Sequence, residues 1–571
     1  MKDKIYNLLD LFAGAGGLSN GFEQTGSFKV AGAIEINGAA QETYIKNHGN
    51  NPEIILKDNN GKSDITKINF QEVKNNLQLD PNSTVLVGGP PCQGFSNANR
   101  QKNYLISGNN QLVKEFVRAI DEVKPIAFVM ENVKSMQSST HKFFVTKSNG
   151  DEKRDYSSIT HLKTITNDEE AIFNEDSIEL LKTKILPRRL LENITTLNDV
   201  PEPIIKDVDL LIRLRTIQRR FSKNKKTELT NKKEINEVEM IIKLMTSYTA
   251  QNDTAKKIIE DTRQVLTVLK TDPVASEQLI LPLAAFTEYN RFLTRCQELK
   301  DEQIECSKLI ISEETEWLLV NAKVYSYNLV DYLKKVFEHY GYSVTSNVLD
   351  SSKYRVPQRR KRFIMMGIKN KEVELELPGH YSSDSLTVKD AILDLEEVEP
   401  QQEVAGYNDK TYPAEYSESP LTDYYRDKLF NTNTLYNHIN PNSSPLIQKR
   451  FEEIRRTNGK NFHSLSDELK SSYSDASRTQ NTVYLRLNYN EPSPTVVNVR
   501  KSMWQHPRKA RALSVREAAR LQSFQDSFRF YGRKDEQYQQ VGNAVPPLLA
   551  KGIASTLLKY LDKLQQKDSS N

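Results

Sequence analysis

The sequence contains very little cysteine. Cys92, Cys296 and Cys306 are the only cysteines in 571 residues, and no two of them have C-x-x-C spacing. Disulfide frameworks and cysteine-rich zinc sites need more cysteines at closer spacing. The scarcity argues against both kinds of site, fits a reducing cytosol and leads us to expect no metal centre.

Long apolar runs are also absent, and neither sign of charge dominates. No stretch of about 18 apolar residues is present, and the N-terminus leads into a strand-like segment without a signal-peptide core. We therefore expect a cytoplasmic protein without membrane contact. The net charge of +4 permits nucleic acid as a partner without requiring it.

Residues 5–135 alternate between strand-like and helix-like segments. Short aliphatic runs lie at 5–12, 29–37, 83–90 and 125–133. Between them, apolar residues recur at helical spacing. Strands separated by helices of about 10–15 residues indicate βαβ units and a parallel sheet, so we predict an α/β fold.

The composition changes near Met136. Residues 138–322 are polar, charged and poor in glycine, and apolar stripes at helical spacing run from Ile235 to Met245 and from Ile258 to Leu269. We predict a mostly helical insertion there. The α/β pattern returns afterwards, and residues 373–480 are rich in Ser, Asn, Tyr and Pro, which indicates an irregular region of loops.

A glycine-rich segment follows the first predicted strand. In "DLFAGAGGLSNGFE" (10–23), Gly14, Gly16 and Gly17 lie where the strand would pass into a helix. Glycines there let a ligand approach the backbone closely. A tight strand-to-helix turn explains them equally well, so the segment alone is a weak signal.

Two further segments add to it. Glu35 ends the second predicted strand, where an acid can bind both hydroxyls of a ribose. Asp64 and Ile65 offer a carboxylate and an apolar surface to an adenine. Together with the glycines they predict an adenosine-containing cofactor, and the spacing departs from that of a dinucleotide site.

The first cysteine lies in "GGPPCQGFS" (88–96). A lone cysteine is more often a small buried hydrophobe than a nucleophile. Cys92, however, follows two prolines at the carboxyl end of a predicted strand, where open α/β sheets bind ligands. Glu131, in "MENV", ends another predicted strand, and alone it is most simply a surface acid. If the two strand ends adjoin, a nucleophile and a proton donor face one cleft.

A basic segment opens a later strand. In "VPQRRKRFIMMG" (356–367), Gln358, Arg360 and Arg362 are spaced by two. In a strand these residues share one face, so two guanidiniums can point into one site. A basic cluster is usually a solvated surface, but this one leads into an apolar strand.

These motifs, in this order, resemble those of the DNA (cytosine-5)-methyltransferase family. The resemblance rests on "DLFAGAGGLSNGFE", "GGPPCQGFS", "ENV", "QRRKR" and "VGNAVPP", with "SVREAARLQSF" (514–524) as a further element. It covers about 1–135, 325–370 and 480–565. It implies a Rossmann-like domain that uses S-adenosyl-L-methionine to methylate C5 of a cytosine flipped out of a specific duplex DNA site.

The resemblance also implies roles for individual residues. Cys92 would add to C6 of the base, which activates C5, and Glu131 would hold N3 and the exocyclic amine. Arg362 would contact O2, and Arg360 would support the loop and a phosphate. The implied cofactor-binding residues are Phe12, Gly14, Gly16, Glu35, Asp64, Ile65, Pro91, Leu112 and Asn543. The implied DNA-binding residues are Gln93, Ser96 and Gln358.

The resemblance further suggests how the chain is divided and what it works with. The predicted parts are two catalytic segments (1–137 and 323–372), the insertion (138–322), a target-recognition region (373–480) and a C-terminal segment that completes the catalytic domain (481–571). Double-stranded DNA is the expected partner. By family habit we expect a bacterial, nucleoid-associated enzyme with a cognate restriction endonuclease as a functional partner.

The insertion departs from the family, which typically has a short link between "ENV" and "QRRKR". Its segment 213–226 contains seven basic residues and no acidic one. The insertion is interpreted first as a helical decoration with its own core, and otherwise as a source of phosphate contacts through Arg213–Lys226 or as a dimer contact. We hypothesise that it raises DNA affinity non-specifically.

Two rival functions stay open. A subfamily with the same motifs methylates tRNA, but it carries a Cys-Phe-Thr signature that this sequence lacks. A catalytically inactive DNA-binding regulator would lose the Pro-Cys or Glu-Asn-Val residues, and this chain keeps both.

Overall fold

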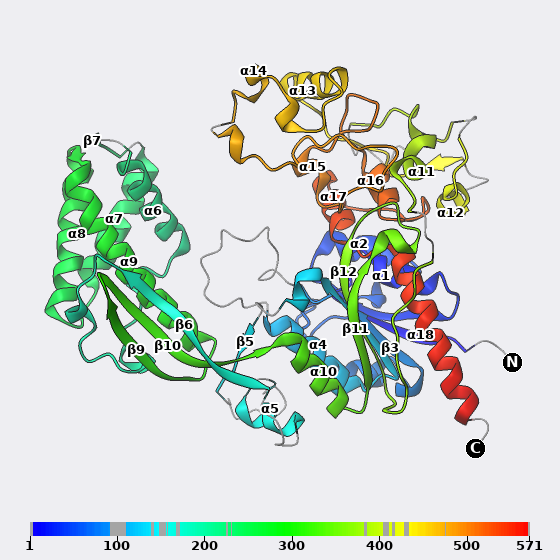
Figure 1. Cartoon of the computed structure of the whole chain (residues 1–571), viewed down its shortest axis with the longest axis horizontal. Coiled ribbons are helices and arrows are strands. Elements are labelled where there is room, and N and C mark those ends of the chain that lie inside the picture. Colours follow the sequence, from blue (N-terminus) through cyan, green and yellow to red (C-terminus); the bar gives the residue numbers. More distant parts are fainter. Residues whose placement is uncertain are drawn as a thin grey trace. The chain divides into compact units, whose positions relative to one another are not determined.

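The structure is a computed structural model that describes most of the chain. The described residues are 4–91, 110–138, 142–147, 156, 158–166, 172–223, 226–229, 231–381, 385–402, 410–413, 417–427, 433–473 and 475–568. They form two compact units (Figure 1). The first takes its residues from 1–95, 111–138 and 336–571, and the second mainly from 139–335.

A six-stranded sheet with the order β11-β12-β4-β3-β1-β2 organises the first unit. Its strands are β1 (Tyr6–Leu11), β2 (Phe28–Ile34), β3 (Thr84–Gly88), β4 (Ala127–Val133), β11 (Ser343–Asp350) and β12 (Lys361–Ile368). The first four are parallel, whereas β12 is antiparallel to β4, and β11 to β12. The α/β prediction is confirmed.

Helices cover both faces of this sheet, which is why its inner strands β1 and β3 are buried on both sides. The helices are α1 (Gly17–Glu23), α2 (Gly38–Asn47), α3 (Phe70–Asn76), α4 (Asn110–Val123), α10 (Leu329–His339) and α18 (Pro547–Asp568). Side chains of α1 and α18 pack in one core with Val129 of β4. On the opposite face, Phe128 contacts Phe116 of α4 and Phe337 of α10.

The rest of the first unit is built from short elements and loops, as the composition predicts. Its helices are α11 (Val388–Ile392), α12 (Thr422–Arg426), α13 (Pro445–Arg456), α14 (Asp467–Lys470), α15 (Val499–Ser502), α16 (Val515–Leu521) and α17 (Lys534–Asn543). Its strands are β13 (Lys410–Thr411) and β14 (Thr434–Leu435). An apolar core centred on Trp504, Val515 and Phe524 joins α11, α12, α15, α16 and α17, whereas α13 and α14 pack in a separate core with Phe462.

The second unit contains the predicted helices and also a sheet that was not predicted. Its helices are α5 (Ile159–Ile165), α6 (Val208–Phe221), α7 (Lys232–Ser247), α8 (Asp253–Thr271) and α9 (Ser276–Asp301). Its strands are β5 (Lys142–Phe144), β6 (Phe173–Thr183), β7 (Lys226–Thr227), β8 (Val274–Ala275), β9 (Cys306–Glu314) and β10 (Trp317–Asn328).

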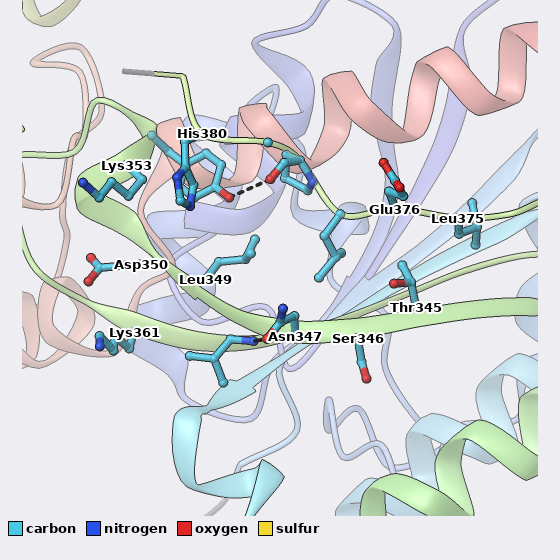
Figure 2. A pocket seen from close by; sticks show the side chains of 15 residues that line it. Thr345, Ser346, Asn347, Leu349, Asp350, Lys353, Lys361, Leu375, Glu376 and His380 are labelled. Carbon is cyan, nitrogen blue, oxygen red and sulfur yellow. Dashed lines mark hydrogen bonds between the residues drawn. The ribbon is translucent and has the colours of Figure 1, made fainter. Parts of the chain in front are cut away.

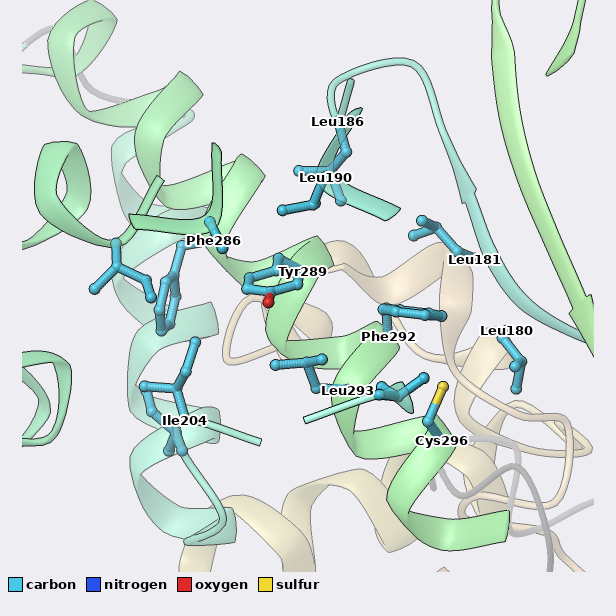
Figure 3. Packing of buried hydrophobic residues seen from close by; sticks show 14 of the residues in the cluster. Leu180, Leu181, Leu186, Leu190, Ile204, Phe286, Tyr289, Phe292, Leu293 and Cys296 are labelled. Atoms are coloured by element: carbon cyan, nitrogen blue, oxygen red, sulfur yellow. The ribbon is translucent and has the colours of Figure 1, made fainter. Parts of the chain in front are cut away.

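In that sheet, β10 pairs antiparallel with β5, β6 and β9. β6 has buried residues only in its second half, and Leu309 is the one buried residue of β9. The other positions of both strands carry many Glu, Asp, Lys and Ser, which hide the strand signal. One continuous core links the sheet with the helices. Figure 3 shows Leu180 and Leu181 of β6 near Phe292 and Cys296 of α9. The unit therefore has a hydrophobic core of its own.

Among the described residues, no helix is both long enough and apolar enough to cross a membrane.

Candidate active site at the carboxyl edge of the sheet

The turn after β1 has an unusual backbone. Phe12, Gly14 and Gly16 have φ angles of 58°, 56° and 94°, in the left-handed region. Only glycine adopts that region without steric cost, so Phe12 is a strained residue, and such residues cluster at functional sites. A Cβ added at Gly14 would have no heavy atom within 4 Å. The backbone at Gly14 is therefore open to a ligand.

Glu35 lies beside this turn. Its Oε2 accepts a hydrogen bond from the Gly14 N–H at 2.8 Å, and its Oε1 accepts one from the Asn37 N–H at 2.8 Å. The next residue, Ile36, is a large apolar side chain that is 74% exposed. Ile36 is not among the residues predicted from the sequence, although an aliphatic residue directly after an acid that could bind a ribose indicates an apolar surface for the cofactor.

Asp64 and Ile65 form a turn farther along the chain. Asp64 Oδ1 accepts hydrogen bonds from the Thr66 N–H and hydroxyl at 3.0 and 2.9 Å. Ile65 is buried, and its carbonyl accepts a hydrogen bond from Arg118 at 2.8 Å. Ile65 is thus fixed in the core of the unit, and contact of these two residues with an adenine remains a prediction.

A buried polar group lies under the glycine turn. Asp10 accepts hydrogen bonds from the hydroxyls of Ser19 and Tyr44. Burial raises the pKa of Asp10 to about 7, because desolvation outweighs these hydrogen bonds. The carboxyl group joins β1, α1 and α2 beneath the turn.

The C-terminal segment packs against the same turn. A Cβ added at Gly17 would come within 2.4 Å of the Val545 carbonyl oxygen, so only glycine allows this approach. Asn543 ends α17, is exposed, and accepts a hydrogen bond from Gln539 at 2.8 Å. The residues that follow Asn543 therefore fold back beside the turn after the first strand.

Glu131 and Arg362 form an ion pair on one face of the sheet. Arg362 Nε donates to Glu131 Oε1 at 2.7 Å, and both side chains are largely buried. Arg362 pairs with Val133 and Ile364 with Glu131 across β12 and β4, so the two charged residues are diagonal neighbours, which long side chains can bridge. The ion pair therefore follows from the strand register.

Burial raises the pKa of the Glu131 carboxyl, and the positive charges of Arg362 and Arg360 oppose this shift. Burial likewise lowers the pKa of Arg362, although Glu131 stabilises its charge. For both groups desolvation is the larger effect. Glu131 is therefore more easily protonated than an exposed glutamate, which suits a proton donor.

The turn that leads to Cys92 lies against Glu131. A Cβ added at Gly89 would come within 2.8 Å of Glu131 Oε2, and the Asn132 side chain donates a hydrogen bond to the Pro90 carbonyl at 3.0 Å. Pro91 is half-buried. Cys92, Gln93 and Ser96 lie outside the described residues. The strand ends of β3 and β4 therefore do adjoin, as the cleft prediction requires.

Leu112 lies near the start of α4 and is half-buried. Its contact with a cofactor remains a prediction.

Arg360 and Gln358 occupy different places from those predicted. β12 begins at Lys361, so the three residues do not share one strand face. The Arg360 guanidinium is buried and donates to the carbonyls of Val496 and Gly542 at 2.8 and 3.0 Å. It supports the C-terminal segment, although its charge still acts on Glu131.

The prediction that Gln358 contacts DNA is corrected by its burial. Its side chain is fully buried and donates to Gln522 Oε1 at 2.7 Å and to the Leu521 carbonyl at 3.2 Å. It also accepts a hydrogen bond from the Val496 N–H at 2.6 Å. These contacts occupy both ends of the amide, so Gln358 connects chain segments within the protein.

A groove of about 730 Å³ lies elsewhere on the first unit, along β11. Figure 2 shows Asp350, Lys353 and Lys361 toward one end and Thr345 and Glu376 toward the other. None of the residues that line it belongs to the predicted site. The acid–guanidinium pair and the glycine turn mark the candidate active site better than this groove.

Comparison with known proteins identifies the family. Residues 6–158 and 307–559, more than half of the chain, match the sequence profile of the C-5 cytosine-specific DNA methylases. This chain belongs to that family. The first matched part contains Glu35 and Glu131, and the second contains Arg362 and Asn543. The matched residues therefore include members of the candidate site from both sides of the insertion.

Individual methylases of bacteria match shorter stretches. The chain is 29% identical over 259 residues to the Type II methyltransferase M.DdeI of Desulfomicrobium norvegicum, which is 42% of this chain and 60% of that one. It is 33% identical over 224 residues to M1.HphI of Haemophilus parahaemolyticus, which is 39% of this chain and 50% of that one. The alignments thus span between half and two thirds of these relatives.

One solved structure has the same fold. It is described as a DNA modification methyltransferase encoded within a prophage of E. coli, with a TM-score of 0.50, 16% identity, and coverage of 98% of this chain and 99% of that one. At this identity the likeness concerns the fold alone. It supports the α/β methyltransferase architecture of the methylase family.

Proposed function

We propose that this chain is a DNA (cytosine-5-)-methyltransferase that modifies a flipped-out cytosine in a specific duplex site. The observation that carries the proposal is the Glu131–Arg362 ion pair, which lies against the Gly89–Pro91 turn in a member of the DNA methylase family. The turn leads directly to Cys92, the first of only three cysteines.

The glycine turn and Glu35 fit an adenosine-type cofactor, namely S-adenosyl-L-methionine. Gly14 leaves room at the backbone, Glu35 is fixed beside it, and Ile36 presents an exposed apolar side chain. When bound, S-adenosyl-L-methionine supplies an electrophilic methyl group. We assign its binding to Phe12, Gly14, Gly16, Glu35, Asp64, Ile65, Pro91, Leu112 and Asn543, with Ile36 added.

The protein's own groups activate the base. The Cys92 thiolate adds to C6 of cytosine, which makes C5 nucleophilic and splits one difficult step into two easier ones. Glu131, whose pKa burial raises, donates a proton to N3 as the sulfur attacks. Arg362 orients Glu131 and offers its remaining N–H groups to O2 of the base. After methylation, the C5 proton is lost to water, the C6–S bond breaks to release the Cys92 thiolate, and the N3 proton returns to Glu131.

We further propose that the enzyme protects bacterial DNA from a cognate restriction endonuclease, in the cytoplasm at the nucleoid. The similarity to bacterial Type II methyltransferases supports this role. The endonuclease would be a functional partner that recognises the same site. The region 373–480 would read that site.

Methyl transfer from labelled S-adenosyl-L-methionine tests the proposal. Purified full-length protein should label duplex genomic DNA and leave tRNA unlabelled, and Cys92→Ser should abolish labelling. Cys306→Ser is the matched control, because Cys306 is a half-exposed cysteine of the second unit. Labelling of tRNA alone would favour the RNA enzyme, and a folded wild-type protein that labels neither would favour the inactive regulator.

A further inference from the structure

The basic segment of the insertion divides into two sets on α6. Arg213 and Arg220 are seven residues apart, which is about two helical turns, and therefore lie on one flank. Arg213 pairs with Glu237, and Arg220 pairs with Glu234 at 3.1 Å, both acids of α7. These two arginines join the helices of the bundle. The hypothesis that the whole segment 213–226 binds phosphate is therefore wrong for Arg213 and Arg220, whose guanidinium groups pair with acids of α7.

Arg215 and Arg219 form the second set, and they lie on a different side of α6. They are four residues apart, so their side chains are neighbours. Among the described residues, no carboxylate forms an ion pair with either of them, and the charge from another helix that acts on the Arg215 pKa is that of Arg291 on α9. Arg219 is exposed and Arg215 is half-buried.

Arg291 completes this cluster. Its Nε is buried and has no hydrogen-bond partner among the described residues. Arg295, one turn later on α9, is held differently, because it donates to the carbonyls of Glu179 and Leu180 at 3.2 and 3.1 Å. The nearby Glu288 accepts a hydrogen bond from the Thr183 hydroxyl. The three arginines therefore lie on two helices that pack together, α6 and α9, and the charge of Arg291 acts on Arg215.

The electrostatics of the cluster are unfavourable for the protein alone. Burial lowers the pKa of Arg215, and Arg291 and Arg219 lower it further, with no acid acting in the other direction. Burial and Arg291 also lower the pKa of Arg295, against the opposing charges of Glu179 and Glu298. Like charges held together with free N–H donors are stabilised by an anion.

We propose that Arg215, Arg219 and Arg291 form a phosphate-binding site for the backbone of duplex DNA. The proposal rests on the proposed function, because a DNA methylase domain in the same chain brings duplex DNA to the insertion at high effective concentration. Guanidinium groups match phosphate geometry through paired N–H donors. Backbone contacts of this kind add affinity without sequence information.

Substitution of the three arginines tests the proposal in the full-length protein. Arg215→Gln/Arg219→Gln/Arg291→Gln is titrated with a duplex that contains only A·T pairs, so that no cytosine can enter the active site. We expect weaker binding and a plot of log affinity against log salt whose slope is lower by about two to three, because each lost phosphate contact removes about one. Methylation should show a higher KM for DNA with kcat unchanged.

The matched control removes three charges elsewhere in the same unit. Lys243, Lys256 and Lys257 are exposed on α7 and α8, and Lys243→Gln/Lys256→Gln/Lys257→Gln should keep the wild-type salt slope. The arginine variant should unfold at the same temperature as the wild type or higher, since mutual repulsion is relieved. The single variant Arg219→Gln, at an exposed position, should lower the slope by about one.

Several results would overturn the site while leaving the methylase function intact. One is an unchanged salt slope in a triple variant that is folded and still methylates DNA. Another is an equal loss in the lysine control, which would indicate net charge instead of a site. A third is a loss of RNA binding with duplex binding intact, which would identify a different occupant. Failure of the wild type to methylate DNA would contradict the proposed function itself.

Discussion

Arginines with acidic partners occur in both units of the molecule, but the second unit also contains arginines that have no carboxylate partner among the described residues. In the first unit, Arg520 donates to Asp526 and Asp394 at 2.6 Å each, and Arg362 pairs with Glu131. In the second unit, Arg215 faces Arg219 and Arg291. An arginine that has an acidic partner within the protein stabilises the fold. An arginine whose charged neighbours are other arginines is available to an anionic ligand.

The candidate site combines both arrangements. Arg362 holds Glu131 in place, whereas Gly14 leaves its backbone open. The same distinction therefore separates supporting residues from binding residues within the first unit. Substitutions of supporting residues should mainly lower stability, and substitutions of binding residues should mainly lower activity or affinity.

The largest effect is expected at Glu131. Glu131→Gln keeps the shape of the side chain but removes its ability to give and take a proton, so methyl transfer should fall by about 10²–10⁴-fold. Binding of cofactor should be unchanged. The control Glu338→Gln, on exposed helix surface, should keep full activity. Near wild-type transfer by Glu131→Gln would remove Glu131 from the chemistry.

The next effect concerns stability. Arg520→Gln leaves Asp526 and Asp394 buried without their guanidinium, so the free energy of unfolding should fall by about 3–5 kcal/mol. Arg215→Gln, in the second unit, should either raise the free energy of unfolding or lower it by no more than a few tenths of the loss expected for Arg520→Gln. Urea unfolding followed by circular dichroism compares the two, and equal losses would contradict the distinction between the units.

Acid should destabilise the first unit at a defined pH. Burial lowers the pKa of His438 and His506 to about 4, because desolvation outweighs the nearby Glu517. Unfolded histidine titrates near 6.5, so the unfolded state takes up protons first. This stability is complete above pH 6.5 and is lost as the pH falls toward 4, by about 3 kcal/mol for each residue.

Denaturant unfolding between pH 7.5 and about pH 4 checks the histidines. The double variant His438→Gln/His506→Gln should show a shallower loss over this window than the wild type. The same slope in both proteins would mean that other groups cause the acid sensitivity.

The smallest effect is expected at Gly14. Gly14→Ala meets no neighbouring atom, so only its left-handed φ opposes the change, at a cost of about 1–2 kcal/mol in stability. The affinity for S-adenosyl-L-methionine should fall as well, because the added alanine side chain would occupy open space at the proposed cofactor site. Gly16→Ala should be worse, because its Cβ would lie 2.4 Å from His48 Nε2. Calorimetric titration of both variants checks this order.

Much of the fold and part of the site follow from local patterns in the sequence. The aliphatic runs give the strands, and acids at strand ends give Glu35 and Glu131, because the carboxyl ends of parallel strands meet at one edge of the sheet. The sequence could not show that β12 begins only at Lys361. That register turns Arg360 toward the carbonyls of distant segments and buries Gln358.

The second unit was harder to predict for a physical reason. The strands of its sheet carry polar residues on the outward face, and the partners of Arg213 and Arg220 lie on another helix. Spacing by itself groups the arginines of 213–226 as one cluster. Helical geometry and the positions of Glu234, Glu237 and Arg291 are needed to divide it into structural and binding sets.

Bisulfite sequencing of DNA from cells that express the protein tests the proposed activity most directly. We expect cytosines within one short sequence to be protected from conversion in the presence of the wild type, and none in the presence of Cys92→Ser or Glu131→Gln. The Cys306→Ser control should give the wild-type pattern. A folded, abundant wild-type protein that leaves every cytosine as convertible as in cells without it would contradict the assignment of this site to DNA methylation.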